Sequence, residues 1–285
     1  QLPEVLVDDY YHGLRQLANR RDQLTRTSTR CKNQLHKLIH DHYPNYKEFF
    51  SNPFGVTALG FWNKYPHPSM LKGAGTKRLA SSLNKFSRNM GSTKAEHILA
   101  LVDKEQALTI DAKMTIIVIR QIIEQLQQIT NHLDELDELI KEALGQSDTQ
   151  LETMPGVGPV TALNVLSRVG PIEKFSSADK LARHAGIAPV DDSSGPRTRQ
   201  KRSKAGDRQL NAAIHRIALN QISIDRKGVP KCPVALDYYE RKIAEGKSKL
   251  SALTCLKRRL CDIIYAMLRD KTPYIEPASR PNSAA

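Results

Sequence analysis

The chain has 285 residues, a hydrophobic content of 40%, a formal net charge of +13 at pH 7 and a pI near 9.6. This length can bury a core in two or three structural units, and the hydrophobic content excludes a disordered tail. The positive charge predicts a polyanionic partner, either nucleic acid or an anionic membrane surface. The longest apolar run, residues 115–119, is far shorter than the ~20 residues of a membrane-spanning helix, so nucleic acid is favoured.

The N-terminus and the cysteines indicate a compartment. The chain starts at Gln1 without a basic and apolar leader, which predicts no signal peptide. The four cysteines form no Cys-x-x-Cys pair, which predicts buried thiols in a reducing compartment rather than disulfides or a zinc site. They are Cys31, Cys232, Cys255 and Cys261.

Residues 14–42 have a helical pattern. Leucines, Cys31 and His42 recur at three-, four- and seven-residue steps, while the other faces carry arginines and lysines. The basic faces are typical either of a solvated helix surface or of a helix that follows a nucleic-acid backbone. His36, His40 and His42 have no acidic or thiol partner at ligand spacing, so we predict a His-rich helix end and no metal site.

Residues 44–91 are richer in Pro, Gly, Ser and aromatic residues, which predicts short helices joined by turns, with Phe61 and Trp62 in the core. A long helix follows. Its apolar residues advance by alternate steps of three and four, the spacing of a coiled-coil seam. They are Ile119, Ile122, Leu126, Ile129, Leu133, Leu136 and Ile140. The seam predicts a partner helix, either in another chain or earlier in this one; homodimerisation is the favoured interpretation.

The segment 151–163 resembles a helix-hairpin-helix motif, in which a Pro-Gly-Val-Gly turn joins two short helices. Gly156 and Gly158 remove side chains, so that backbone N–H groups at the start of the next helix can meet a phosphate oxygen. The alternative is a tight turn between helices that has no ligand. The following segment, residues 175–187, predicts a helix with Ser176 or Ser177 as its N-cap and Gly186 as its stop.

The segment 189–208 is expected to be a loop between helices. It sets two serines, Ser193 and Ser194, and Gly195 beside a run of cations. A hydroxyl, a flexible backbone and dense positive charge are what a nucleophile that attacks a phosphodiester needs. The charges share one sign, which favours phosphate binding over a solvated linker. The candidate nucleic-acid-binding residues here are Arg197, Arg199, Lys201, Arg202, Lys204 and Arg208.

Four motifs occur together in order: Met-Pro-Gly-Val-Gly-Pro at 154–159, Leu-Ala-Arg-His-Ala-Gly-Ile-Ala-Pro at 181–189, Ser-Ser-Gly at 193–195 and Ser-Lys-Ala-Gly-Asp-Arg-Gln-Leu at 203–210. With them, the chain from about residue 10 to 275 resembles the bacterial insertion-sequence transposases of the DEDD-plus-serine class, the bridge-RNA-guided recombinases. The resemblance implies that a serine attacks DNA and forms a phosphoserine link. Ser194 matches best, with Ser193 as the alternative; Asp191 and Asp192 lie close but are expected on the loop surface.

In that family an N-terminal RuvC-like domain supplies four carboxylates for Mg²⁺. Those carboxylates lie upstream of the segment that aligns with residues 14–33, so the resemblance implies that this chain starts after them and holds no metal itself. A chain without that domain is expected to bind nucleic acid and to be inactive in recombination alone. Arg197, Arg199 and Arg208 would stabilise charge in the transition state.

The expected fold is mainly α: a helical N-terminal segment (residues 1–105, the tail of the RuvC-like domain with linker helices), a coiled-coil helix (106–150) and a compact helical serine domain (151–285). The expected function is DNA strand cleavage and joining in transposition of a mobile element. The alternative is a non-catalytic, dimeric nucleic-acid-binding module. The expected partners are DNA, a guide RNA and a second copy of the chain, with no membrane, in the bacterial cytoplasm at the nucleoid.

Overall fold

The computed structural model describes residues 9–71, 74–86, 91–104, 112–194, 197–202 and 205–276, and it describes the backbone alone at residues 104, 112, 189–194 and 197–202. The fold is mainly helical, as the sequence predicts. The chain forms two compact units, residues 21–135 and residues 1–20 with 136–285. Two long helices, α1 (Asp9–His42) and α6 (Ala112–Gly145), contribute one end to each unit.

The unit of residues 21–135 confirms the prediction of short helices joined by turns. Between the ends of α1 and α6 it contains α2 (Tyr46–Phe49), α3 (Val56–Lys64), the 3-10 turn η1 (Pro68–Met70), α4 (Thr76–Asn84) and α5 (Gly91–Lys104). Aromatic residues fill its core, and Tyr43, Phe49, Phe61 and Trp62 are all buried. Their polar atoms are satisfied: the Trp62 Nε1–H donates to the carbonyl of Pro53 at 3.0 Å.

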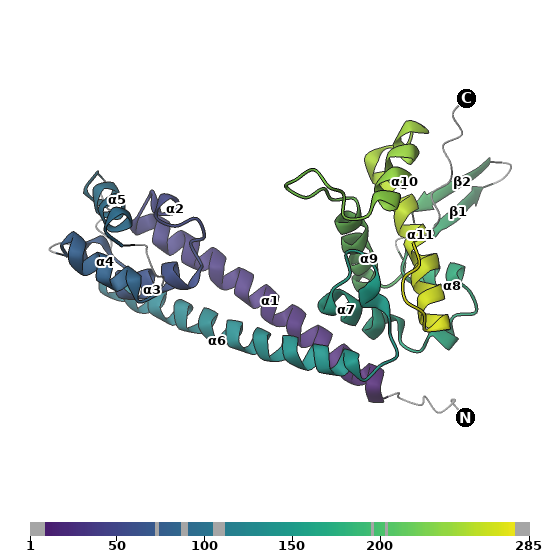
Figure 1. The fold of residues 1–285 in the computed structure, drawn as a ribbon, viewed down its shortest axis with the longest axis horizontal. Helices are drawn as coiled ribbons and strands as arrows, with labels where there is room; N and C mark the ends of the chain where they lie inside the picture. The colour runs from purple at the N-terminus through teal and green to yellow at the C-terminus, as the bar shows by residue number, and fades with distance from the viewer. Residues whose placement is uncertain are drawn as a thin grey trace. The chain divides into compact units, whose positions relative to one another are not determined.

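The apolar seam of α6 is covered from within the chain. In the unit of residues 21–135, Ile119 and Leu126 are buried, and the Cys31 Sγ of α1 donates to Gln125 Oε1 of α6 at 3.2 Å. Figure 1 shows the two helices side by side. In the other unit, Ile140 packs in one cluster with Leu14 of α1. The earlier helix is therefore the partner of the seam in this structure, while homodimerisation stays a prediction.

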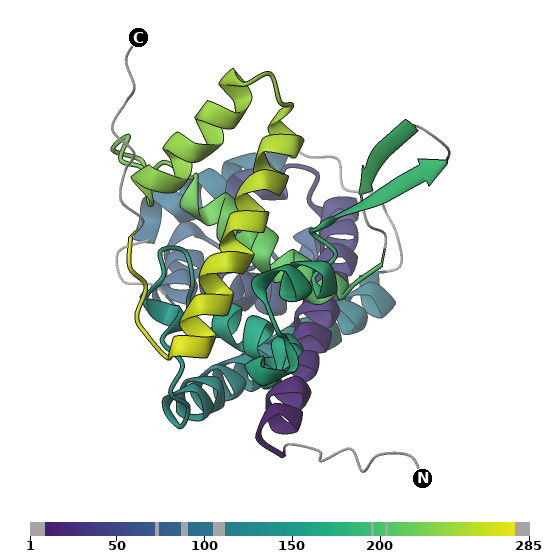
Figure 2. The same cartoon turned by 90° about the vertical axis from the view of Figure 1, so that its right-hand side faces the viewer.

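The second unit is built around its last helix. After α6 it contains η2 (Leu151–Thr153), α7 (Pro159–Val169), η3 (Ile172–Lys174), α8 (Ala178–His184), β1 (Pro189–Ser194), β2 (Arg197–Arg202), α9 (Arg208–Gln221), α10 (Pro233–Ala244) and α11 (Lys249–Asp270). Helix α11 packs against α8, α9 and α10, and it buries Leu256, Leu260 and Ile264. In Figure 2 α11 is the long yellow helix, and the strand pair extends beyond the helices of this unit.

The segment that carries the serines differs from the expectation. The sequence predicted an interhelical loop over 189–208, but β1 and β2 pair as an antiparallel two-stranded sheet. Strands with one buried face show alternating apolar residues, and this segment has almost none because both strands are rich in polar and charged residues. The usual signal for a strand was therefore missing.

Candidate nucleic-acid interface

The two serines are the last residues of β1. In the register of the hairpin Ser194 pairs with Arg197, Ser193 with Thr198 and Asp192 with Arg199. Successive strand positions alternate between the faces of a sheet, and paired positions share a face. Positions 192, 194, 197 and 199 thus belong to one face, and positions 191, 193, 198 and 200 to the other. The register places Ser194, and not Ser193, on the face of Arg197 and Arg199.

The register also assigns the remaining hairpin cations to one face or the other. Lys201 pairs with Val190 and belongs to the set of Ser194, whereas Arg202 pairs with Pro189 and belongs to the set of Ser193. Lys204 lies outside the described residues. Arg208 is the first residue of α9, and its side chain is exposed.

The hairpin is anchored by a close approach of two glycines. Gly186 follows α8 with a φ of +64°, and Gly206 precedes α9 with a φ of +115°. A Cβ atom on Gly206 would lie 2.5 Å from the backbone nitrogen of Gly186 and 2.8 Å from the carbonyl oxygen of His184. The Asp207 N–H also donates to His184 at 2.7 Å. Only glycine fits this contact, which brings the two ends of the hairpin segment together.

Two helix caps flank this anchor. The side chain of Ser177 accepts a hydrogen bond from the Lys180 N–H and caps α8, which confirms one of the two predicted N-caps, and the helix stops at Gly186 as predicted. The Asp207 Oδ1 accepts from the N–H groups of Gln209 and Leu210, both at 2.8 Å, and caps α9. The path of the chain into and out of the hairpin is therefore fixed by local hydrogen bonds.

A cavity of about 620 Å³ opens beside the anchor, between the ends of the hairpin segment, α9 and α11. Its polar and charged lining residues are Asp207, Arg208, Asn211, His215, Thr254 and Lys257. Asn211 Nδ2 donates to the carbonyls of Ala185 at 2.7 Å and Gly186 at 3.3 Å. Among the described residues, the cavity is lined by two cations, Arg208 and Lys257, and by one carboxylate, Asp207, which already accepts the two backbone hydrogen bonds of its cap, so the balance of charge suits an anionic group.

Sequence reasoning missed Asn211 and Lys257. Lys257 is buried and lies on the apolar face of α11, between Leu256 and Leu260. A lysine at a core position of an amphipathic helix is a signal that could have found it, because such a residue is almost never buried without a partner. Asn211 has no comparable signal in the sequence, since its role depends on the carbonyls of Ala185 and Gly186, which lie near it only in the folded chain.

The glycine-rich turn is docked onto the end of α9. Gly156 has a φ of +83°, and its carbonyl accepts a hydrogen bond from Asn220 Nδ2 at 3.2 Å. The carbonyl of Pro155 accepts one from Gln221 Nε2 at 3.0 Å. A Cβ atom on Gly156 would lie 2.9 Å from the Asn220 Cβ, so Gly156 is required by packing as well as by conformation.

Gly158 has a different environment. It is the N-cap of α7, and a Cβ atom placed on it would have no atom within 4 Å. Pro159 has no N–H, and the N–H groups of Thr161 and Ala162 donate to the Gly158 carbonyl at 2.9 Å, which leaves the N–H groups of Gly158 and Val160 at this end of α7. Open space at Gly158 leaves room for an anion to approach the start of α7, and phosphate binding there stays a prediction.

The basic and histidine-rich faces of α1 have partly structural roles. Arg15 Nε donates to the carbonyl of Ser167 at 2.9 Å. His36 shares a hydrogen bond with the Tyr46 hydroxyl, and His42 is buried with its ring 4.9 Å from that of His67. Within the described ranges, no group of three His, Cys, Asp or Glu side chains is placed to hold a metal. Nor is any described helix long and apolar enough to cross a membrane.

Comparison with known proteins identifies relatives of this chain. Residues 148–231, which include the glycine turn, both serines and α9, match the Transposase IS116/IS110/IS902 family. The Insertion element IS116 uncharacterized 44.8 kDa protein of Streptomyces clavuligerus is 30% identical over 261 residues, 90% of this chain and 64% of that protein. The Insertion element IS900 uncharacterized 42 kDa protein of Mycobacterium paratuberculosis is 28% identical over 271 residues, 94% of this chain and 66% of that protein.

A shorter match is to the Pilin gene-inverting protein of Moraxella bovis, which is 28% identical over 158 residues, 55% of this chain and 45% of that protein. The chain spans 64% and 66% of the two insertion-element relatives. Residues 148–231 therefore carry the sequence signature of a transposase family, in a chain that covers about two thirds of the proteins it resembles.

Proposed function

We propose that this chain is part of a transposase of the IS116/IS110/IS902 family and that it cleaves and joins DNA strands through Ser194. One observation carries the proposal: the family match spans both the serine hairpin and the glycine turn, in the part of the chain where cations are densest. The insertion-element relatives and the pilin gene-inverting protein support a reaction that moves or inverts DNA.

The choice of Ser194 over Ser193 is supported by the strand register. Position 194 shares a face with positions 197 and 199, so the two arginines are the cations nearest in the hairpin framework. A phosphodiester under attack gains negative charge, and arginine can stabilise that charge with two parallel hydrogen bonds. The positions paired nearest to Ser193 on its face are the uncharged Thr198 and Gln200, and the cation of that face, Arg202, pairs with Pro189 at the far end of the hairpin.

In the proposed step the Ser194 Oγ attacks the phosphorus of a phosphodiester and forms a P–O bond to the protein. The bond from phosphorus to one sugar oxygen breaks, and that oxygen leaves as a hydroxyl after it takes up a proton. The serine proton passes to a general base, because a neutral hydroxyl is a weak nucleophile. Asp192 is our candidate for this base, since its position shares the face of Ser194. Strand joining is the reverse reaction with another sugar hydroxyl.

The glycine turn would bind the same nucleic acid at a distance from the chemistry. Backbone N–H groups at the start of α7 meet a phosphate oxygen and position the strand without reading its sequence. Guide RNA as a second partner rests on the family resemblance. The described residues do not offer a ligand set that fits the Mg²⁺ of that resemblance, and no step of the proposed reaction involves a metal.

The test is the formation of a covalent protein–DNA adduct by the complete protein, detected with labelled target DNA on a denaturing gel. Ser194→Ala should abolish adducts, Ser193→Ala should retain them, and Arg197→Gln should lower their rate about 100-fold or more if this arginine stabilises the developing charge. All three variants should keep salt-sensitive DNA binding. Adducts that persist in Ser194→Ala would overturn the assignment. Binding without any adduct in the wild type would favour the alternative, a non-catalytic binding module.

A further inference from the structure

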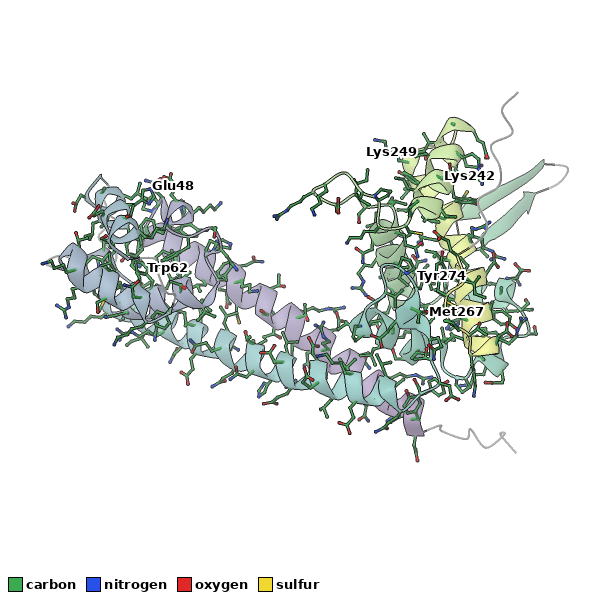
Figure 3. All side chains as sticks on the ribbon, viewed as in Figure 1. Glu48, Trp62, Lys242, Lys249, Met267 and Tyr274 are labelled. Atoms are coloured by element: carbon green, nitrogen blue, oxygen red, sulfur yellow. The ribbon has the colours of Figure 1, made fainter. Side chains whose placement is uncertain are left out.

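The segment between α9 and α10 is a small, ordered projection. It has no part in the proposed strand cleavage or in the proposed phosphate site at the glycine turn. Residues 223–231, which we call the basic tip, leave the end of α9 and return to it. Ile224 and Pro230 form an antiparallel bridge, and the Lys231 N–H donates to the carbonyl of Ser223 at 3.0 Å. Figure 3 shows this segment with its side chains projecting beyond the helices of its own unit. It is thus a short hairpin-like loop closed by one β-bridge and backbone hydrogen bonds.

The turn of the basic tip is held by one carboxylate. The Asp225 Oδ1 accepts hydrogen bonds from the N–H groups of Lys227 and Val229, both at 2.8 Å. The Gly228 N–H donates to the Asp225 carbonyl at 3.1 Å, and Gly228 has a φ of +82°. This is a four-residue turn that ends in a left-handed glycine, a common hairpin connection. The conformation of the tip is therefore set before any partner binds.

The side chains that the turn presents are basic and apolar. Arg226 and Lys227 occupy its two central positions and are exposed, and neither side chain makes a hydrogen bond or ion pair with a described residue. Ile224 and Val229, on the two arms, are each 56% exposed. The only acidic residue of the tip, Asp225, already accepts two backbone hydrogen bonds. An ordered loop with free cations and exposed branched side chains is complementary to a polyanion with apolar base and sugar edges.

The basic tip is also next to the proposed phosphate site. Its root is Gln221, whose carbonyl accepts from the Cys232 N–H at 3.2 Å and whose side chain holds the carbonyl of Pro155. Asn220, one residue earlier, holds the carbonyl of Gly156. The end of α9 thus joins the basic tip to the turn before α7. A strand bound at the start of α7 would therefore pass near the root of the tip.

We infer that the basic tip is a second nucleic-acid contact, continuous with the glycine turn. Arg226 and Lys227 bind phosphates, and Ile224 and Val229 pack against sugar and base edges. This inference rests on the proposed function for its nucleic-acid partner, but it assigns residues that have no part in strand cleavage. The turn fixes the backbone that carries both cations, so no backbone entropy is lost when they bind.

The charge test compares two double variants with the same loss of charge. Arg226→Gln with Lys227→Gln changes the tip, and Lys77→Gln with Arg78→Gln changes a pair of exposed basic residues, consecutive in the sequence, on α4 of the other unit. Binding of a labelled DNA duplex is measured over a range of salt concentrations. The tip variant should lower the slope of log affinity against log salt by about 1.8, or about 0.9 per phosphate contact, while the α4 variant leaves it unchanged. Equal slopes for the two variants would overturn the inference.

The apolar contacts and the preformed turn of the basic tip are tested by separate variants. Ile224→Ser with Val229→Ser should weaken binding several-fold without a change in the salt slope, because no phosphate contact is lost. Asp225→Ala should weaken binding, and Asp225→Asn should restore it, since an amide oxygen can accept the same two hydrogen bonds. A loss of binding in Asp225→Ala that Asp225→Asn does not restore would count against the preformed turn.

Different experimental results would overturn the inference and the proposed function. If adducts depend on Ser194 but all tip variants bind DNA like the wild type, the inference fails alone. If the wild type binds no nucleic acid, both fail. Anionic phosphatidylserine vesicles serve as a competing probe: a tip variant that loses vesicle binding but keeps DNA binding would identify the tip as a membrane contact and overturn the inference.

Discussion

Lys257 of α11 donates a hydrogen bond from its Nζ to the Oδ1 of Asn211 on α9, at 2.6 Å, although Lys257 is only 4% exposed. Asn211 in turn donates to the carbonyls of Ala185 and Gly186. One chain of hydrogen bonds therefore runs from α11 through α9 to the turn after α8, next to the glycine contact that anchors the serine hairpin. Hydrogen bonds from a charged donor are stronger than neutral ones, so this link should contribute to stability.

Lys257→Met tests this link. The substitution keeps an unbranched side chain of similar length but leaves Asn211 Oδ1 without its charged donor, which we expect to cost ~1–3 kcal/mol of unfolding free energy. The control is Lys249→Met, at an exposed position of the same helix, which should change stability by less than about 0.5 kcal/mol. Urea unfolding measures both. Equal midpoints for the two variants would show that the link does not stabilise the unit.

The glycine contact gives a second prediction. Gly206→Ala should destabilise the chain by more than ~1 kcal/mol, because its φ of +115° is strained for alanine and the new Cβ would meet backbone atoms of Gly186 and His184. Gly13→Ala is the matched control. Gly13 lies in α1, where an added Cβ would meet no atom within 4 Å, so alanine should stabilise by about 0.5–1 kcal/mol. Thermal unfolding midpoints measure both variants. A shift of both midpoints in the same direction would contradict the predicted role of the glycine contact.

The helices and several of their details could be predicted because their signals are local. Ser177 as a cap, Gly186 as a stop and Phe61 with Trp62 as core residues all follow from short patterns, and the structure confirms them. The serine hairpin could not be predicted, since its strands consist mostly of polar and charged residues and so lack apolar alternation. Pairing between two polar strands depends on their register, which no single strand encodes.

In the candidate site, too, some features have a local sequence signal and others depend on the tertiary structure. The sequence pointed to Ser193 and Ser194 through composition and the family resemblance, and only the register separates them by face. The hydrogen bond between Lys257 and Asn211 was not predicted, because it joins residues 46 positions apart in the sequence. The seam of α6 was recognised from its spacing, but spacing does not say which helix covers it. Which chain supplies the partner is a property of the tertiary fold.

The pH dependence of stability should report on His42. This side chain is 1% exposed, and its Nδ1 has no hydrogen-bond partner among the described residues. Burial lowers the pKa of His42 below its ordinary 6.5, as does the charge of His67, while Asp41 acts in the opposite direction. Below pH 6.5 the unfolded chain binds a proton that folded His42 does not. Stability should therefore fall as the pH decreases from 6.5 towards the lowered pKa.

His42→Phe tests this assignment, because phenylalanine keeps an aromatic ring in the core and cannot be protonated. Unfolding midpoints at about pH 7.5 and about pH 5 should differ less in the variant than in the wild type. Some dependence should remain, since burial also lowers the pKa of His36. An unchanged difference between the two midpoints would mean that other groups account for the acid sensitivity.

The last prediction separates the two partners that the seam of α6 could have. Leu126 is 2% exposed within the single chain, so Leu126→Asp should bury an unpaired carboxylate and destabilise the unit of residues 21–135 by at least ~3 kcal/mol. Ile117, on the same helix, is 58% exposed, and Ile117→Asp should leave stability nearly unchanged. Urea unfolding and sedimentation measure both variants.

These measurements give opposite results for a seam between two copies. In that case Leu126→Asp would convert the dimer to a monomer, and its unfolding midpoint would differ from that of the wild type only by the concentration-dependent contribution of dimerisation. If the protein is a dimer with α1 covering the seam, dissociation should instead follow from changes on the exposed face of α6, such as Ile117→Asp. A different result would support a seam between two copies: the dimer survives Ile117→Asp and dissociates in Leu126→Asp, and Leu126→Asp loses no stability beyond the contribution of dimerisation. Only a seam that α1 leaves uncovered in the monomer would give this result.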